Sequence, residues 1–243
     1  MPADQQPPVP SVWARPRAKR EQPALSRDRI VSEAIRLLDA EGIDALSMRS
    51  LGTRLGAGAT SLYRHVANKD ELIELVVDQI YGEMRVPDAG DPARWRAAVT
   101  EAARSLRSIV LRHPWAVSVF GQVGLAHLGP NLTRQSERLL ALLRTAGFAA
   151  DEADQAMNLL IAYVIGMTTS EAAYLAMLAR SGQSEQDLLE HLRPAAEHAL
   201  RDHPLLRESQ SAVQGKDPGQ LREESFTYGI ERILDGLETR LRP

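Results

Sequence analysis

Apolar residues recur at helical spacing along most of the chain, and glycine, proline and capping residues separate the periodic segments. Between Ser26 and Gly42, apolar side chains fall at i, i+4, i+7 and i+8 from Ile30, which places them on one face of a helix. The same kind of pattern predicts further helices at 92–112, 115–127, 132–145, 150–178 and 221–241. Ala, Leu, Arg and Glu dominate the composition and β-branched runs are scarce, so we predict an all-α fold.

Two short helices with a glycine-containing turn between them are predicted within residues 47–68. Ser47 is a good N-cap, because its hydroxyl can accept a hydrogen bond from a free backbone N–H of the first turn. Gly56 stands where that helix would end and can take the left-handed conformation. Thr60 can cap a second helix that runs through 62–66. The segment holds several cations and no carboxylate, which is typical of a helix-turn-helix that lays its second helix in a DNA groove.

An ordinary surface corner between two helices is the alternative for this segment, and the flanking residues favour the DNA-binding interpretation. The stripe on the preceding helix can cover the apolar side chains of the pair, and Asn68 starts a fourth helix with Glu71 at capping-box spacing. Proline, glycine and aspartate then break the pattern at 86–92. We place a DNA-binding domain at 25–82 and a second domain at 83–243.

Residues 1–24 are rich in proline and poor in apolar side chains, so we expect a disordered arm. The arm carries four cations shortly before the first helix, Arg15, Arg17, Lys19 and Arg20. It is either a solubilising tail or a DNA contact whose arginines enter a narrow minor groove.

The second half of the chain predicts a surface for a partner chain. The helix at 150–178 is apolar over more than one face between Met157 and Met167, as expected of a helix that is buried on several sides. The terminal helix carries one strong apolar stripe. These two helices from each of two chains would form a four-helix interface in a homodimer. Between them we expect a polar helix followed by a connection at 182–204, and then a flexible stretch at 209–219.

Composition and charge limit the other classes of function. The net charge of −3 gives no overall indication of nucleic acid binding, so only the local distribution of charge does. The absence of cysteine excludes a disulfide framework, a thiolate nucleophile and a cysteine-based zinc site. We see neither a signal peptide nor an apolar run near the ~20 residues of a membrane span, so we expect a cytoplasmic protein.

An enzyme and a ligand-independent DNA-binding protein are the alternative functions. Asp187 with His191, and His198 with Asp202, lie at i, i+4 and could share one helix face, but such pairs are common on polar helices. No Ser-His-Asp spacing, phosphate loop or HExxH motif is present, so we expect no catalysis, metal or cofactor. The long second half argues against a protein that only binds DNA, because a dimer interface alone would not need so many helices.

The motifs of the first half resemble the tetracycline-repressor (TetR) family of bacterial transcription regulators. They are Ala40-Glu41-Gly42, Leu46-Ser47-Met48-Arg49, Gly56, Leu62-Tyr63-Arg64-His65-Val66 and Asn68-Lys69-Asp70-Glu71-Leu72. Later segments are similar to the family's ligand domain, namely Leu139 to Phe148, Ala153, Gly166 and Tyr228 to Leu234. The resemblance implies an all-α protein, with a three-helix helix-turn-helix DNA-binding domain and a larger helical ligand-binding and dimerisation domain.

The resemblance also implies which residues contact DNA. Arg49 resembles the arginine of the second helix that reaches DNA, and His65 and Lys69 match phosphate contacts. The expected DNA-binding set, which includes the cation Arg64 of the same stretch, is Arg49, Thr60, Ser61, Tyr63, Arg64, His65 and Lys69. Tyr63 could instead be packed with an exposed hydroxyl. Gly58 and Ala59 depart from the family pattern and offer only van der Waals contact, so a contact from the basic arm becomes more useful.

In the family, helices of the second domain enclose a small-molecule pocket, and its occupancy separates the two recognition helices. Here we expect it to be lined by Trp95, Leu106, Trp115, Phe120, His127, Met157, Ile161 and Tyr163. Ordinary core packing is the alternative for each of them. The tripeptide that starts at His127 resembles one near the metal site of tetracycline-binding members, but its distance to Gly147 is shorter, so we expect no magnesium–tetracycline site.

The expected function is that of a ligand-responsive regulator. A homodimer would bind a pseudo-palindromic operator with half-sites one helical turn apart, ~34–36 Å. It would repress transcription until a small hydrophobic or amphipathic molecule releases it from the operator.

Overall fold

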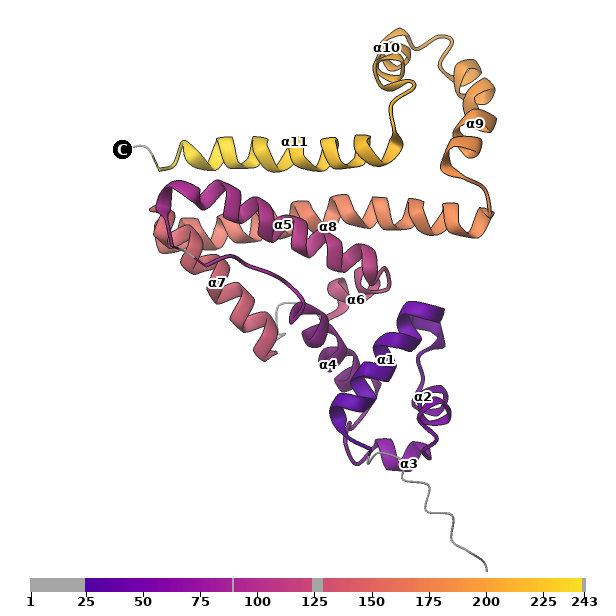
Figure 1. The fold of residues 1–243 in the computed structure, drawn as a ribbon, viewed down its shortest axis with the longest axis vertical. Coiled ribbons are helices and arrows are strands. Elements are labelled where there is room, and N and C mark those ends of the chain that lie inside the picture. The colour runs from indigo at the N-terminus through magenta and orange to yellow at the C-terminus, as the bar shows by residue number, and fades with distance from the viewer. Residues whose placement is uncertain (1–24, 89, 124–128, 242–243) are drawn as a thin grey trace, which may run out of the picture.

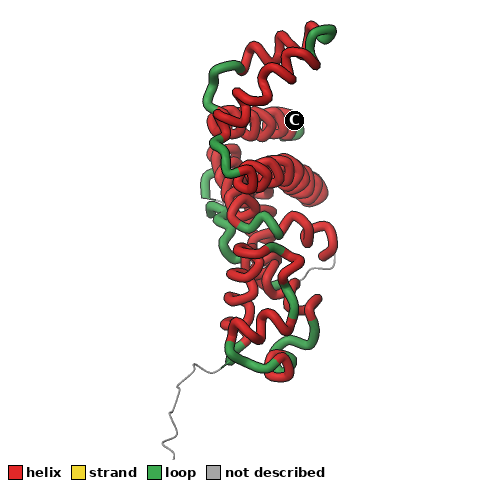
Figure 2. Tube along the Cα trace, turned by 90° about the vertical axis from the view of Figure 1, so that its right-hand side faces the viewer, coloured by secondary structure: helices red, strands yellow, loops and turns green. Residues whose placement is uncertain are grey.

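The structure is a computed structural model that describes residues 25–88, 90–123 and 129–241. Figure 2 shows helices joined by loops, and the described ranges contain no strand, which confirms the predicted all-α fold. The N-terminal elements are α1 (Arg27–Glu41), η2 (Ile43–Ala45), α2 (Met48–Leu55), α3 (Ala59–Leu62) and α4 (Lys69–Tyr81). The others are η3 (Pro92–Arg94), α5 (Trp95–Arg112), α6 (Ala116–Val123), α7 (Pro130–Ala146), α8 (Ala150–Ser181), α9 (Glu185–Ala199), α10 (Pro204–Val213) and α11 (Pro218–Glu238).

The α1–α3 unit lies at one end of the molecule (Figure 1), and α1 begins and ends at residues suited to capping. The Ser26 hydroxyl accepts from the Arg29 backbone N–H at 3.2 Å, and α1 ends at Gly42. The stripe on α1 is fully buried. It packs against α2 and α4, and α2 packs against α3. Met48, Leu51, Leu55 and Leu62 are buried in the same apolar cluster as the α1 stripe, which confirms the predicted core of the first three helices.

Helices α5, α7, α8 and α11 form the larger part of the molecule. α5 packs against α7, α8 and α11, and it buries the apolar side chains Trp95, Val99, Ala102, Leu106 and Ile109. The ring of Trp95 meets that of Phe148 edge-on, with centroids 5.4 Å apart. Gly147 ends α7 and allows the turn into α8.

Helix α4 joins the two parts, because it packs against α1 and also against α6 and α7. Asp78 on α4 is buried and caps the beginning of α7. Its Oδ1 accepts from the backbone N–H groups of Asn131 and Leu132, both at 3.0 Å, and its Oδ2 accepts from the Asn131 amide at 3.0 Å. A carboxylate favours a helix N-terminus, so this contact fixes α4 against α7.

Helices α9 and α10 project at the opposite end from α1–α3 (Figure 1). They expose large apolar side chains, namely Leu189, Leu192, Leu205, Leu206 and Val213. The flexible stretch predicted at 209–219 is wrong at both ends, because α10 continues to Val213 and α11 begins at Pro218.

Helix α8 contradicts the expectation that no segment is long and apolar enough for a membrane. Among the described residues, it alone passes that test by length and composition. Only 22% of its most apolar window is buried inside the chain. Leu159, Met167 and Met177 are among its exposed side chains.

Candidate nucleic-acid interface and effector cavity

The short helices α2 and α3 are fixed by local hydrogen bonds and by a close turn. The Ser50 backbone N–H donates to Ser47 Oγ at 3.0 Å, and the Ser47 N–H donates to Ser50 Oγ at 3.0 Å, a reciprocal cap. Gly56 ends α2 in the left-handed conformation, with φ of 65°. A Cβ on Gly52 would lie 2.8 Å from the carbonyl oxygen of Ala57, so the turn packs directly on the backbone of α2.

The start of the second helix of the pair differs from the prediction. α3 begins at Ala59, with extended Gly58 before it, so Thr60 lies inside the helix and its predicted capping role is wrong. The regular helix also ends at Leu62 and is shorter than the predicted one, and turns follow it. Leu62 and Val66 are buried and anchor this segment to the core.

The predicted DNA-contacting side chains that are described gather on this unit, most of them exposed. Arg49, Thr60, Tyr63, Arg64 and Lys69 are exposed, whereas Ser61 and His65 are partly buried. Tyr63 is 51% exposed, so the packed alternative does not hold for its ring. Within the described ranges, Arg49, Arg64 and Lys69 have no carboxylate partner within salt-bridge distance. Arg15, Arg17, Lys19 and Arg20 lie outside the described residues.

Arg54 of the same stretch has a different role. Its Nε donates to Glu33 at 2.8 Å and an Nη donates to Glu41 at 3.0 Å, and both acceptors belong to α1. The hydrogen bond from Arg54 lowers the pKa of Glu33 below its usual value, despite partial burial. Arg54 therefore fixes the crossing of α1 and α2. No local pattern in the sequence distinguishes this cation from its neighbours.

Only some of the residues predicted to line the effector pocket lie around one cavity in the structure. Leu106 and Ile161 line a small apolar cavity of about 20 Å³ between α5, α7 and α8, where Met84 and Leu160 also lie. Met157 is buried on α8. His127 lies outside the described residues.

The remaining predicted lining residues have other neighbours in the structure. Trp95 packs on Phe148, as described above, and the ring of Phe120 lies 5.5 Å from that of Tyr81. The hydroxyl of Tyr163 donates to the carbonyl of Phe226 at 3.1 Å. The indole N–H of Trp115 donates to the Asp39 carboxylate at 2.7 Å.

A second, wider cavity of about 350 Å³ opens between α8 and α11. It is lined by Met167, Ser170, Glu171, Tyr174, Leu221, Arg222, Ser225 and Phe226. Behind it, the nearly buried Arg107 donates to both oxygens of Glu171 at 2.8 Å and also pairs with Glu223. The guanidinium lies over the ring of Phe226, 4.7 Å from its centroid.

This network was missed from the sequence, although one signal was available. Arg107 falls on the apolar face of its helix, between Ala103 and Val110. A cation in that position needs a buried partner, and the hydrogen bonds that Arg107 donates to Glu171 and then to Glu223 raise its pKa although burial lowers it.

The molecule combines a small helical unit with exposed cations and a larger helical layer with cavities. This combination is typical of a DNA-binding regulator with a separate effector domain. The family model for tetR-family bacterial regulatory proteins matches residues 30–76, and that for the tetracyclin repressor-like C-terminal domain matches residues 87–241. The chain therefore belongs to the tetR family.

Individual relatives agree with this assignment. The chain is 40% identical over 184 residues to an HTH-type transcriptional regulator of Saccharopolyspora erythraea, covering 75% of this chain and 76% of the relative. It is 33% identical to the HTH-type transcriptional repressor DrrR1 of Streptomyces coeruleorubidus, covering 89% and 78% of the two chains. The crystal structure of Streptomyces coelicolor ActR in complex with actinorhodin is similar at a TM-score of 0.73 and 32% identity, covering 88% and 96%.

These findings establish the predicted class of function. The protein is a ligand-responsive, DNA-binding transcriptional regulator, and its partners are operator DNA, a small-molecule effector and a second copy of the chain.

Proposed function

We propose that this regulator binds the phosphates of its operator through Arg49, Arg64 and Lys69, with Thr60, Ser61, Tyr63 and His65 beside them. The observation that carries the proposal is a contrast between cations of one short stretch, residues 49–69. Arg54 is neutralised by two carboxylates of α1, whereas the other cations keep their charge free and exposed. A cation without a carboxylate partner can neutralise a DNA phosphate and release the counterion bound there, which favours binding.

The second copy of the chain packs on α8 and α11 in this proposal. α8 leaves Leu159, Met167 and Met177 uncovered, and α11 exposes Tyr228. A four-helix interface from two chains would cover these side chains, and it would also account for the membrane-like composition of α8. The dimer then presents two helix pairs to half-sites ~34–36 Å apart, and it acts in the cytoplasm.

The effector binds among α5, α7 and α8, where the small apolar cavity lies. A space of about 20 Å³ holds no organic molecule, so binding requires a wider conformation of these helices. The effector releases DNA only to the extent that it prefers this wider conformation. We expect a small hydrophobic or amphipathic compound, since ActR, similar in sequence and fold, was solved with actinorhodin bound.

We propose that the chain divides into the DNA-binding domain at 25–82 and the effector and dimerisation domain at 83–243. No enzymatic activity is proposed. Asp187 and His191 are exposed on α9, and an exposed pair lacks the burial by which active sites tune their acids and bases.

The test starts with DNA and does not require the operator sequence. Duplexes retained by the protein are selected from a random-sequence pool, and their binding is measured by gel shift at low ionic strength. We expect an inverted-repeat duplex bound by two chains, as judged by sedimentation. A monomeric complex, or no enriched duplex, would refute the proposal. Actinorhodin is then titrated into the complex as the first probe of release.

A further inference from the structure

One carboxylate of the α1–α3 unit reaches across to the larger helical layer. Asp39 lies near the end of α1, and its Oδ1 accepts from His113 Nδ1 at 2.7 Å and from Trp115 Nε1 at 2.7 Å. Both donors come from the connection between α5 and α6, and they are only 3% and 6% exposed. Hydrogen bonds to an ionised acceptor are stronger than those between neutral groups.

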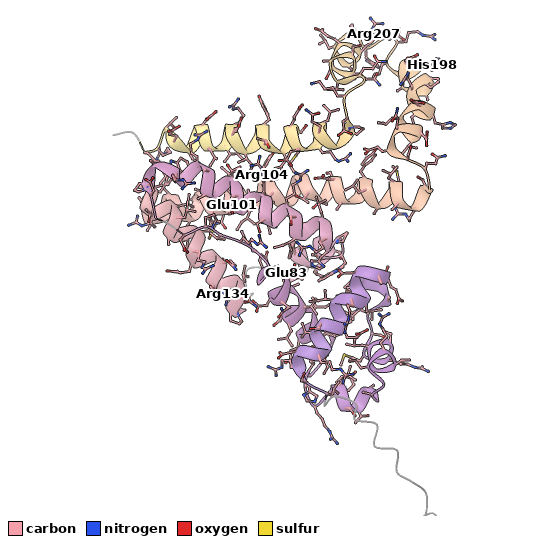
Figure 3. The ribbon with its side chains drawn as sticks, in the orientation of Figure 1. Glu83, Glu101, Arg104, Arg134, His198 and Arg207 are labelled. Atoms are coloured by element: carbon pink, nitrogen blue, oxygen red, sulfur yellow. The ribbon has the colours of Figure 1, made fainter. Side chains whose placement is uncertain are left out.

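A second contact holds the same connection against the end of α4. Glu83 forms an ion pair with Arg112, the last residue of α5, and its Oε2 lies 3.4 Å from His113 Nε2. Figure 3 shows Glu83 where α4 meets the larger helical layer. The imidazole of His113 therefore stands between a carboxylate of α1 and one that follows α4.

His113 is also fixed to the helices on both sides of it. Its backbone N–H donates to Ile109 of α5 at 2.9 Å, and its carbonyl accepts from Ala116 of α6 at 2.9 Å. α5 lines the small apolar cavity. A shift of the end of α5 that widens this cavity must either carry Asp39 with it or break both hydrogen bonds.

We propose that Asp39 is a positioning residue that couples the effector cavity to the DNA-binding helices through His113 and Trp115. This inference rests on the proposed function. In this inference, one carboxylate of the DNA-binding unit transmits the conformational change between the two domains. Asp78, which caps α7, connects α4 to the effector domain at another point.

The test uses operator DNA as the probe, because coupling between two sites is reciprocal. Amide hydrogen exchange is measured with and without the duplex selected from the random pool. In the unmodified protein, we expect DNA binding to change exchange in α2 and α3 and also in α6 and the first turns of α7. In Asp39→Asn, which keeps the shape but loses the charge, the change in α2 and α3 should remain and that in α6 should fall at least threefold.

Three further variants separate coupling from folding. Asp44→Asn makes the same chemical change at an exposed residue of η2 and should behave like the unmodified protein. His113→Asn keeps a donor near the position of Nδ1 and should retain most of the effect, whereas His113→Leu should lose it. Circular dichroism checks that each variant keeps its helix content.

Several outcomes would overturn the inference. These are no exchange change in α6 or α7 of the unmodified protein on DNA binding, a full change in Asp39→Asn, equal behaviour of the two His113 variants, and loss of helix content in Asp39→Asn. If the unmodified protein enriches no duplex, the proposed function itself fails and this inference fails with it.

Discussion

Removing the guanidinium of Arg49 tests how the proposed interface binds DNA. Arg49 is exposed near the start of α2 and has no carboxylate partner in the described part of the chain, so its charge is available to a phosphate. One phosphate contact contributes about 0.9 to the slope of log affinity against log salt concentration. A dimer uses Arg49 twice, so Arg49→Ala should lower this slope by about 1.8.

This change in slope is large enough to measure. Between roughly 50 and 200 mM salt, the unmodified protein should lose about tenfold more affinity than Arg49→Ala. Fluorescence anisotropy with a labelled operator duplex at several KCl concentrations gives both slopes. The melting temperature should hardly change, because an exposed substitution usually alters stability by less than about 0.5 kcal/mol.

A matched variant distinguishes a contact from a change in net charge. Arg138→Ala removes an equally exposed arginine from α7, in the larger helical domain, and should leave the slope unchanged. An unaltered slope in Arg49→Ala would mean that Arg49 contacts no phosphate. If both variants lowered the slope by the same amount, the effect would come from the overall charge and not from a phosphate contact.

Three other predictions concern residues that fix one helix against another. Arg107→Met should lower the free energy of unfolding in urea by about 2–3 kcal/mol, because it removes both hydrogen bonds to Glu171 and leaves this carboxylate only Arg222, at 3.5 Å, and a loss below about 1 kcal/mol would contradict this. Gly52→Ala should lower both the melting temperature and operator affinity, because its Cβ would lie 2.8 Å from a backbone oxygen of the turn; a rise in melting temperature, as helix propensity alone predicts, would count against the reasoning. The hydrogen bond from Arg54 lowers the pKa of Glu33 in the folded state, so the stability from this pair is present above the usual value of 4.5 and is lost as the pH falls through the lowered pKa. Arg54→Met should therefore show a weaker fall of melting temperature below pH 4.5, and identical acid dependence would exclude the linkage.

Helix starts and stops could be predicted from the sequence, because a capping bond joins residues only three apart. Ser47 and Asn68 cap their helices as predicted, through the backbone N–H of Ser50 and Glu71. The predicted cap at Thr60 was wrong, because α3 begins after Gly58 without a hydrogen bond from a capping side chain. The family motifs supplied what spacing alone did not, namely the class of regulator.

The cavity and the buried ion pairs could not be predicted in the same way. Arg107 lies 64 residues before Glu171 and 116 before Glu223, so no local pattern connects them. Trp115 has the size and polarity of a lining residue, yet its N–H bonds to Asp39. Periodicity identifies which side chains turn inward, but not whether they meet empty space or other side chains.

If two chains associate through the exposed apolar face of α8, as proposed, the activity of this regulator depends on its abundance in the cell. Leu159 is 49% exposed and Met177 is 42% exposed in the single chain, so association and operator binding are linked steps. Below the dissociation constant of the pair, the number of pairs follows the square of the chain concentration. While most operator copies are free, halving synthesis would then cut operator occupancy about fourfold, so the response is steeper than proportional.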